Sequence, residues 1–350
     1  MIKNYKKHLI PLNTNIKYAL NILNDLGLDA ILFVVNDDLK LIGSLTDGDV
    51  RRGLLRDLTL SDPVDKFIQD NPKYIYQHKY NLKTIIEMRN DYYKIIPVVD
   101  KYLRIKAILN FRIDKSYLPI DVVIMAGGKG SRLKPLTDKT PKPLLKVGDK
   151  TILDHNIDRF VAYGVNNFWI TLCYHSKKII DHLGKVKDRG INFNFIKEKS
   201  PLGTIGALAS IDNFNNDYIL LTNSDLLTNM NYEEFFLDFI SRDADMSVVS
   251  IPYEVNIPYA VINSKKNKVV SFLEKPKYTY YSNAGIYLIK KSILNRIPKN
   301  KFFNSTDLMD VLIKEGKDLI SYPISDYWLD IGKPNDFEKA QNDIKYINFS

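Results

Sequence analysis

The sequence has a single cysteine, Cys173, among its 350 residues. One thiol cannot form a disulfide within the chain, and the absence of such cross-links is typical of proteins in the reducing cytoplasm, where we expect this one. Because Cys173 lies in an apolar run, we expect it in the core rather than at a site as a nucleophile.

Long apolar runs are also missing from the sequence. No segment reaches the roughly 20 apolar residues that span a bilayer, and the polar stretch at 1–8 does not resemble a secretion signal. We therefore expect neither a membrane partner nor export.

Basic clusters are absent, although the formal net charge is +9. Residues 1–118 carry 19 Lys and Arg against 14 Asp and Glu, a net of +5, which leaves 31 against 27, or +4, for the rest. The excess is spread thinly, without the basic run typical of nucleic-acid binding, so we expect no nucleic-acid partner. The 45% of hydrophobic residues and the length suit about two globular domains.

The first third of the chain contains an internal repeat. The segment FVVNDDLKLIGSL at 33–45 returns 64 residues later, without a gap, as PVVDKYLRIKAIL at 97–109, which predicts a strand, a turn and a strand in each copy. A helical pattern precedes each copy, with Asn15 and Asn81 where residues cap helix N-termini. Residues 1–118 are therefore expected to hold two copies of an α+β unit, at about 1–66 and 67–118.

This segment resembles a tandem pair of CBS domains. The string GSLTDGD matches the family's G-x-x-T-x-x-D, and the resemblance implies that Thr46 and Asp49 bind an adenine nucleotide that regulates the protein. The alternative is that both residues only cap the helix that follows. The second copy has Asn110 and Ile113 at the aligned positions, so at most one nucleotide site is expected.

The stretch at 121–147, DVVIMAGGKGSRLKPLTDKTPKPLLKV, indicates a phosphate site. A buried strand runs into glycines that let the backbone turn sharply and come close to a ligand. These are Gly127, Gly128 and Gly130. Two cations follow, Arg132 and, between two prolines, Lys142. The stretch lacks the spacing of a Walker loop or a dinucleotide fingerprint, and the alternative is a surface turn with solvated cations.

Strands and helices alternate through the rest of the chain, which predicts a Rossmann-like, doubly wound α/β fold with a mostly parallel sheet and ligands at the carboxyl ends of its strands. The predicted strands are 122–126, 168–173, 191–196, 218–222 and 246–251. Asp225 follows the fourth strand, and Asp330 precedes a glycine in an apolar setting. Two such carboxylates suit Mg²⁺, which combines them with substrate phosphates and water, although one alone could equally cap a turn.

Further strings contribute candidate ligands. The loop SPLGT is predicted to enter a helix and to turn backbone N–H groups toward a ligand at Gly203 and Thr204. Glu274 and Lys275 can meet a sugar hydroxyl and a phosphate, and Asn283 can both donate and accept. An isolated Glu-Lys pair is more often a solvated surface pair.

Together these strings resemble the sugar-phosphate nucleotidyltransferases, also called sugar nucleotide pyrophosphorylases. The stretch from Ala126 matches the family's A-G-G-x-G-(T/S)-R-L-x-P-L-T and P-K-P-L, while Ile205 replaces a usual alanine. The resemblance implies a catalytic domain at 120–350 that uses Mg²⁺. The roles it implies are catalysis by Arg132 and Lys142, nucleotide binding by Ala126, Gly127, Gly128, Gly130, Gly203 and Thr204, sugar-phosphate binding by Glu274, Lys275 and Asn283, and metal binding by Asp225 and Asp330.

The implied reaction joins a nucleoside triphosphate and a sugar 1-phosphate into a nucleotide sugar and releases pyrophosphate. A CBS pair ahead of a short transferase is similar to the glucosamine-1-phosphate guanylyltransferases of legionaminic acid synthesis, which implies GTP and surface glycan synthesis. UTP, CTP or dTTP with another hexose or heptose 1-phosphate are alternatives, as is a nucleotide-sensing regulator with a vestigial transferase domain. Because CBS pairs often associate, a homodimer is expected.

Overall fold

The computed structural model describes residues 5–77, 80–185 and 191–347. Its contacts divide the chain into two compact units. The first comprises Met1–Pro119 with Phe160–Asn166 and Lys187–Ile191, and the second comprises Ile120–Arg159, Asn167–Val186 and Asn192–Ser350. Within the described ranges, no helix has the length and apolar character needed to cross a bilayer.

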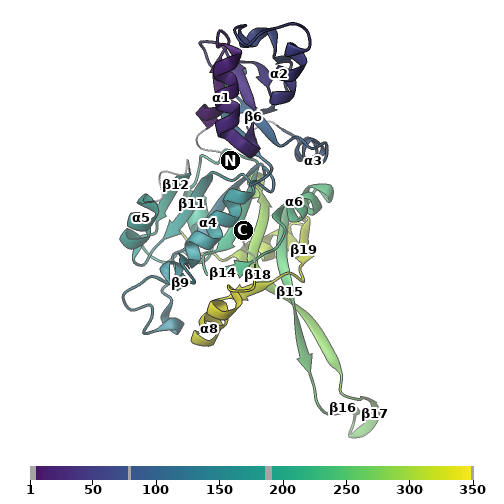
Figure 1. Cartoon of the computed structure of the whole chain (residues 1–350). Helices are drawn as coiled ribbons and strands as arrows, with labels where there is room; N and C mark the ends of the chain where they lie inside the picture. Colours follow the sequence, from purple (N-terminus) through teal and green to yellow (C-terminus); the bar gives the residue numbers. More distant parts are fainter. Residues whose placement is uncertain (1–4, 78–79, 186–190, 348–350) are drawn as a thin grey trace. The chain divides into compact units, whose positions relative to one another are not determined.

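The first unit contains two small sheets, with strand orders β1-β2-β3-β4 and β5-β6-β7 (Figure 1). The elements of the first part are β1 (Leu9–Pro11), α1 (Ile16–Leu26), β2 (Leu32–Val35), β3 (Leu41–Leu45), α2 (Asp47–Leu54) and β4 (Gln69–Asp70). Those of the second part are β5 (Ile75–Tyr76), α3 (Leu82–Asn90), β6 (Ile95–Val99) and β7 (Ile105–Asn110). Each sheet therefore holds the strand, turn and strand predicted for one copy of the repeat.

The hairpins β2–β3 and β6–β7 have the same register, including a bulge at the same point. The matching pairs are Val34–Gly43 and Val35–Leu41 in the first hairpin, and Val98–Ala107 and Val99–Ile105 in the second. Each residue of the second set lies 64 positions after its counterpart. The repeat seen in the sequence is thus also a repeat of backbone geometry.

The two copies exchange backbone hydrogen bonds reciprocally. The N–H of Leu41 donates to the carbonyl of Leu103 (2.9 Å), and the N–H of Ile105 donates to the carbonyl of Leu39 (3.2 Å). Leu39 and Leu103 both have left-handed backbone conformations, with φ of 60° and 63°. The turns of the two hairpins therefore meet as equivalent partners.

The predicted helix caps in this unit are confirmed. The side chain of Asn15 accepts a hydrogen bond from the N–H of Tyr18 at the start of α1, and that of Asn81 accepts one from the N–H of Lys83 at the start of α3. Each cap satisfies a backbone N–H that the helix leaves without a carbonyl partner. The buried face of α1 is formed by Ile16, Ala19 and Leu23.

The second unit is built on a seven-stranded sheet with the strand order β12-β11-β8-β13-β18-β15-β19 (Figure 1). Its strands are β8 (Ile120–Met125), β11 (Asn167–Leu172), β12 (Asn192–Lys197), β13 (Tyr218–Asn223), β15 (Met246–Asn256), β18 (Lys277–Lys290) and β19 (Leu319–Pro323). Only β18 runs antiparallel to its neighbours. The predicted α/β class with a mostly parallel sheet is confirmed.

Helices and short strands surround this sheet. The helices are α4 (Ile152–Ala162), α5 (Ser176–Gly184), α6 (Tyr232–Ser241), α7 (Ser305–Lys314) and α8 (Pro334–Asp343). Two small sheets pair β9 (Lys146–Val147) with β10 (Lys150–Thr151) and β14 (Leu226–Thr228) with β20 (Trp328–Asp330). Buried apolar side chains of the sheet and of α7 form one core, which includes Val123, Leu221, Met246, Ile289 and Leu308.

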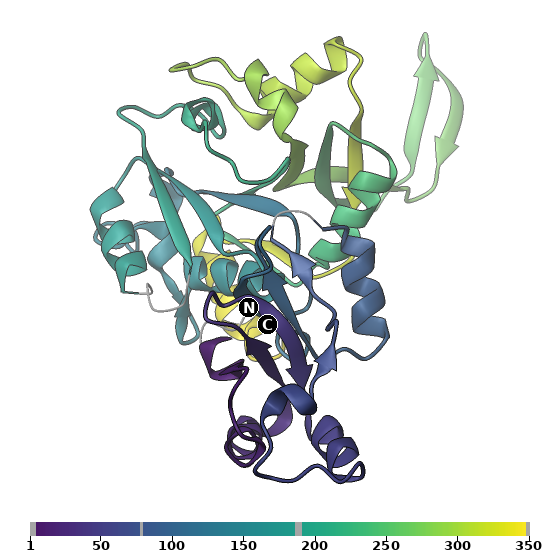
Figure 2. The same ribbon diagram turned by 90° about the horizontal axis from the view of Figure 1, so that it is seen from above.

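Two strands continue beyond the sheet as an arm, which we define as residues 252–282. β15 and β18 keep their antiparallel pairing out to Asn256 and Lys277. The chain between them forms a second hairpin of β16 (Val261–Lys265) and β17 (Lys268–Leu273). Figures 1 and 2 show this hairpin standing clear of the sheet and helices of its own unit.

Candidate active site

A cavity of about 370 Å³ opens at the carboxyl ends of three parallel strands. Met125 ends β8, Thr171 is the last residue of β11 that pairs with β8, and Asn223 ends β13. All three residues line the cavity. This is the edge of the sheet at which a ligand was predicted. The predicted site residues among its lining are Gly127, Gly128, Lys142, Gly203, Thr204 and Asp225.

The glycine loop after β8 forms one wall of this cavity. A Cβ at Gly128 would meet no atom within 4 Å, while one at Gly127 would lie 3.2 Å from Oε1 of Glu198. Gly130 has a left-handed backbone with φ of 64°, and a Cβ there would lie 3.1 Å from the Cβ of Lys142. Glycine at these positions therefore lets the loop approach both Lys142 and the cavity closely.

Ala126 and Cys173 lie beside the loop, and the role of Ala126 in nucleotide binding stays a prediction. Ala126 is buried, and its N–H donates to the carbonyl of Thr171 (3.1 Å). Cys173, expected in the core, is instead only partly buried, with its Cβ 3.5 Å from a Cβ built at Gly127. Burial and then the charge of Glu198 raise the pKa of the Cys173 thiol, which disfavours the nucleophilic thiolate.

Lys142 and two aspartates form the charged centre of the site. Lys142 is only 9% exposed, and its ammonium pairs with Oδ2 of Asp225 and lies 3.7 Å from Oδ1 of Asp330. The pairing of β14 with β20 holds the aspartates together, because Leu226 lies opposite Asp330 and the N–H of Ile331 donates to the carbonyl of Asp225 (3.1 Å). Three residues that are far apart in the sequence thus meet.

The two aspartates have oxygen atoms available for a metal ion. Oδ1 of Asp225 and Oδ1 of Asp330 are buried and have no hydrogen-bond partner in the described part of the chain. Burial and then the charge of Asp225 raise the pKa of Asp330, while Lys142 and Arg132 oppose the rise. Such a pair of carboxylates fits Mg²⁺, which takes its other ligands from phosphate and water. Among the described residues no group of three or more His, Cys, Asp or Glu is placed to hold a metal ion by itself.

Arg132 lies beside the same centre. It belongs to the 3₁₀ helix η4 (Ser131–Leu133), which begins after Gly130. Its Nη1 is 3.7 Å from a Cβ built at Gly332, and Oδ2 of Asp330 is 3.3 Å from that Cβ. The side chain is exposed, so a phosphate at this edge of the sheet can reach its guanidinium.

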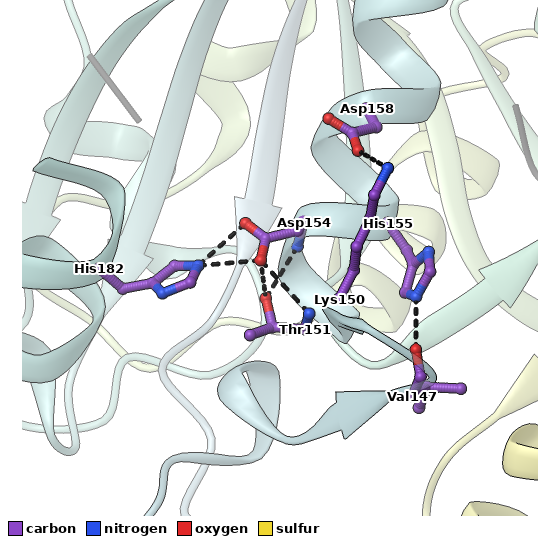
Figure 3. A network of polar contacts seen from close by, with 7 residues as sticks. All are labelled: Val147, Lys150, Thr151, Asp154, His155, Asp158 and His182. Atoms are coloured by element: carbon purple, nitrogen blue, oxygen red, sulfur yellow. Dashed lines mark hydrogen bonds and ion pairs between the residues drawn. The ribbon is translucent and has the colours of Figure 1, made fainter. Parts of the chain in front are cut away.

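A network of polar contacts fixes the hairpin that follows the Lys142 segment (Figure 3). The ring of His155 in α4 bonds the carbonyl of Val147 in β9 (2.8 Å). Nε2 of His182 in α5 bonds Oδ1 of Asp154 in α4 (2.9 Å). Both histidines therefore join elements of the fold, and neither lines the cavity.

The helix predicted after Gly203 is wrong, since the chain forms only the short 3₁₀ helix η7 (Gly206–Ser210). The neighbouring segment takes up the backbone donors of this loop. The N–H of Thr204 donates to Oδ1 of Asn304 (3.2 Å), and the N–H of Ile205 to the carbonyl of Phe303 (3.1 Å). Gly203 and Thr204 nevertheless line the cavity, and their role in nucleotide binding stays a prediction.

Glu198 also lines the cavity and was missed by the sequence analysis. It follows β12, and its N–H donates to the carbonyl of Leu172 (2.8 Å) while its Oε2 accepts the N–H of Leu202 (2.9 Å). Burial raises the pKa of its carboxyl, and the hydrogen bond from Leu202 opposes this. The available signal was its place at the carboxyl end of a predicted parallel strand.

The three residues assigned to the sugar phosphate do not line the cavity of their own chain. Asn283 lies at the base of the arm, where its amide donates to the hydroxyl of Tyr287 (2.9 Å) and its Oδ1 accepts the N–H of Gly285 (2.8 Å). Glu274 and Lys275 are exposed in the arm, just after β17. Their assigned roles stay predictions.

In the first unit, Thr46 and Asp49 form a capping box at the start of α2. The hydroxyl and the N–H of Thr46 donate to Oδ2 of Asp49 (2.6 and 2.8 Å), whose other oxygen pairs with Arg52. The capping role is therefore present, and nucleotide binding stays a prediction. In the second copy, the amide of Asn110 donates to Oδ1 of Asp29 (2.9 Å).

Comparison with known families agrees with this geometry. The model of the family described as nucleotidyl transferase matches residues 121–346, and the CBS domain model matches residues 2–56. This chain belongs to the nucleotidyl transferase family. The CBS match covers most of the first predicted copy.

Among the similar members of the nucleotidyl transferase family is a mannose-1-phosphate guanylyltransferase from Mycobacterium tuberculosis, 30% identical over 234 residues, which are 64% of each chain. The chain thus spans just under two thirds of that relative. A Bacillus anthracis structure, provisionally assigned as a glucose-1-phosphate thymidylyltransferase, is 25% identical with a TM-score of 0.54 and covers 66% of this chain and 97% of its own. HddC from Yersinia pseudotuberculosis complexed with GMP-PN is 29% identical with a TM-score of 0.50, covering 64% and 99%.

Proposed function

We propose that the protein transfers a nucleoside monophosphate from GTP to a hexose 1-phosphate, glucosamine 1-phosphate or a close relative of it, and releases pyrophosphate. The observation that carries this proposal is the meeting of Lys142, Asp225 and Asp330 beside a glycine loop and a cavity. The relatives named as mannose-1-phosphate guanylyltransferases support a sugar 1-phosphate and GTP as substrates.

In this reaction a phosphate oxygen of the sugar 1-phosphate attacks the α-phosphorus of the triphosphate. The bond from that phosphorus to the bridging oxygen breaks, and pyrophosphate leaves with the bonding electrons. The cationic side chains of Lys142 and Arg132 offset the charge that grows on the leaving group, and no side chain has to form a covalent bond. Mg²⁺ held by Asp225 and Asp330 would supply further charge neutralisation and orient the phosphates.

Glu198 supports guanine as the base. Its carboxylate presents only hydrogen-bond acceptors, and guanine offers two adjacent donors, the ring N1–H and the 2-amino group. Uracil and thymine place carbonyl oxygens on both sides of their single ring N–H, and these would face the carboxylate unfavourably. Glu198 lies on the cavity wall next to the glycine loop, with its Oε1 3.2 Å from a Cβ built at Gly127, while the neighbouring Gly128 has no atom within 4 Å of such a Cβ.

Pyrophosphate release tests the proposal directly. The assay would combine GTP, UTP, CTP or dTTP with glucosamine 1-phosphate, mannose 1-phosphate or glucose 1-phosphate, with and without Mg²⁺. We expect the fastest release with GTP, glucosamine 1-phosphate and Mg²⁺. Release with another base or sugar only would overturn that part of the assignment, and no release in any combination would favour the nucleotide-sensing alternative.

We further propose that the first unit binds an adenine nucleotide next to Thr46 and Asp49 and that this binding regulates transfer. The match of the CBS domain model to residues 2–56 supports the site. A protein with these properties would serve nucleotide-sugar synthesis for surface glycans in the cytoplasm.

A further inference from the structure

The arm exposes an unusual amount of apolar surface for 31 residues. Ten of its large hydrophobic side chains are exposed, seven of them by 60% or more. They are Tyr253, Val255, Tyr259, Ile262, Val269, Val270, Phe272, Leu273, Tyr280 and Tyr281. Together they leave roughly 1,000 Å² of apolar surface in water, where a contiguous patch of this size marks an interaction site.

The exposed apolar side chains lie on both faces of the arm. In the ladder of β15 and β18, Tyr253 lies opposite Tyr280 and Val255 opposite Tyr278, while Pro252 lies opposite Tyr281 on the other face, next to the polar pair Glu254 and Thr279. Residues that lie opposite each other, or two apart on one strand, share a face of the ribbon. In the outer hairpin, Val261 pairs with Leu273 on one face and Ile262 with Phe272 on the other. Either face of the arm therefore offers apolar contacts to a partner.

The arm cannot fold back onto its own unit while its ladder is intact. Pairing runs from Ser250–Asn283 to Asn256–Lys277 with one register, and six residues of strand span roughly 20 Å. Glu274 and Lys275 lie in the connection between β17 and β18, just past the outer end of this ladder. An isolated two-stranded hairpin is marginally stable in water, so a partner surface must cover it.

A second copy of this chain offers a fitting surface. The arm leaves the sheet at the edge where β13 ends, the same edge at which the cavity opens. Phe302 at the cavity wall is 63% exposed and provides an apolar contact. The arm carries five Lys and two Glu, a net charge of +3. In the other copy it would meet a cavity whose lining includes the carboxylates of Asp225 and Glu198. The area matches the ~800 Å² per partner of a standard interface.

We propose that two copies exchange arms, so that each arm covers the cavity edge of the other copy and brings Glu274 and Lys275 to its sugar-phosphate side. Lys275 has a left-handed backbone with φ of 41°, a conformation that costs energy for a residue with a side chain and is commonly kept where function requires it. Reciprocal exchange closes a twofold dimer and leaves no free arm. The role of Glu274 and Lys275 rests on the proposed transfer reaction, whereas the dimer does not.

Sedimentation of the full chain over a range of concentrations tests the dimer. We expect the wild type to be dimeric and Phe272→Asp to dissociate at least tenfold more readily. Ile313→Asp is the matched control, because Ile313 on α7 is 62% exposed and Phe272 is 66% exposed; it should sediment as the wild type. If Phe272→Asp fails to fold in a thermal unfolding scan, Tyr280→Ser replaces it. A monomeric wild type, or an arm variant that dimerises normally, would overturn the proposal.

Co-expression of two defective copies tests the exchange. Lys142→Ala disables the cavity, and the double variant Glu274→Ala/Lys275→Ala disables the arm. In a mixed dimer the intact arm meets the intact cavity, so random pairing should restore about a quarter of wild-type pyrophosphate release. No recovery in demonstrated mixed dimers, or full activity of the arm variant alone, would overturn the exchange. If the wild type releases no pyrophosphate at all, the proposed function fails while the sedimentation result still decides the dimer.

Discussion

The charged centre of the cavity brings one lysine together with two aspartates. One ammonium, that of Lys142, faces the carboxylates of both Asp225 and Asp330, and the pKa of Asp330 is raised by burial and by Asp225 despite Lys142. Lys142 and the neighbouring Arg132 together oppose this rise. The sequence predicted all three residues, because each lies in a short string whose neighbours identify it.

Replacement of Lys142 by alanine should reduce turnover by on the order of a hundredfold or more, since it removes a cation that offsets charge in the transition state. The KM for the triphosphate should change less than kcat. Steady-state pyrophosphate release measures both. Lys134→Ala is the control, because Lys134 is an exposed cation whose ammonium pairs with the exposed Asp138 (3.6 Å), and it should leave turnover within about twofold. Normal turnover by Lys142→Ala would remove this residue from the mechanism.

Glu198 gives a second prediction at this scale, concerning pH. Its pKa is raised above the ordinary 4.5 by burial, so on acidification it should gain its proton, and lose its affinity for guanine, at a pH above 4.5. We expect kcat/KM for GTP to fall in that pH range. Protonation of Glu198 should leave kcat/KM for UTP unchanged.

Glu198→Gln should remove the titration and lower kcat/KM for GTP by roughly 10- to 100-fold, the usual discrimination of a paired base contact. It should also improve the use of UTP, because an amide both donates and accepts. A variant with unchanged base preference would contradict the role of Glu198. The sequence places this residue at the carboxyl end of a predicted strand, but its position beside Gly127 depends on how the chain turns after β12.

Among the elements, the strands of the large sheet were the easiest to predict. The strands β8, β11 and β13 and the first half of β15 are buried and follow from apolar runs, while β12 is only partly buried. The segment after Gly203 was mispredicted because its helical appearance is local, whereas the N–H groups of Thr204 and Ile205 bind residues about a hundred positions away. The arm was also missed, because alternating apolar residues indicate a strand without showing whether anything covers it.

The start of α4 allows a stability prediction. The carboxylate of Asp154 accepts from the Thr151 hydroxyl (2.7 Å) and bonds His182 (2.9 Å). Burial alone would raise the pKa of Asp154, but these partners together lower it below the ordinary 3.8. A lowered pKa means that the stabilisation is present above pH 3.8 and is lost as the pH falls through the folded-state value.

Asp154→Asn should therefore lower the free energy of unfolding at neutral pH by about 1 kcal/mol, as the loss of a helix cap does. The difference from the wild type should shrink as the pH falls below 3.8. Urea unfolding at several pH values measures this. Thr151→Val, which removes one partner, should have a smaller effect at neutral pH; a constant difference at all pH values would contradict the assignment to the ionised carboxylate.

For the whole molecule, the gap-free repeat at an offset of 64 residues predicted two equivalent hairpins. The two hairpins share a β-bulge at the same position, so they match in backbone geometry as well as in sequence. The alternation of strands and helices likewise predicted the class of the second unit. Neither pattern contains information on how many copies of the chain assemble, because exposed surface is a property of the folded molecule.

Regulation is the prediction that belongs to this scale. An adenine nucleotide should change pyrophosphate release in the wild type, and Thr46→Ala/Asp49→Ala should abolish both the effect and the heat of binding in calorimetry. These residues also cap α2, so loss of stability must be controlled. Asn81→Ala removes the cap of α3 at a similar cost of ~1 kcal/mol and should keep the nucleotide response. Absence of binding heat with AMP, ADP and ATP would contradict regulation by an adenine nucleotide.

Reciprocal backbone hydrogen bonds join the two copies of the repeat within the first unit. The N–H groups of Leu41 and Ile105 donate to the carbonyls of Leu103 and Leu39, and among the twenty residue types only proline at 41 or 105 would remove a donor. These contacts do not depend on the side chains at 110 and 113, where the second copy departs from the nucleotide motif. The second copy can therefore keep its symmetric contact with the first without a ligand site of its own.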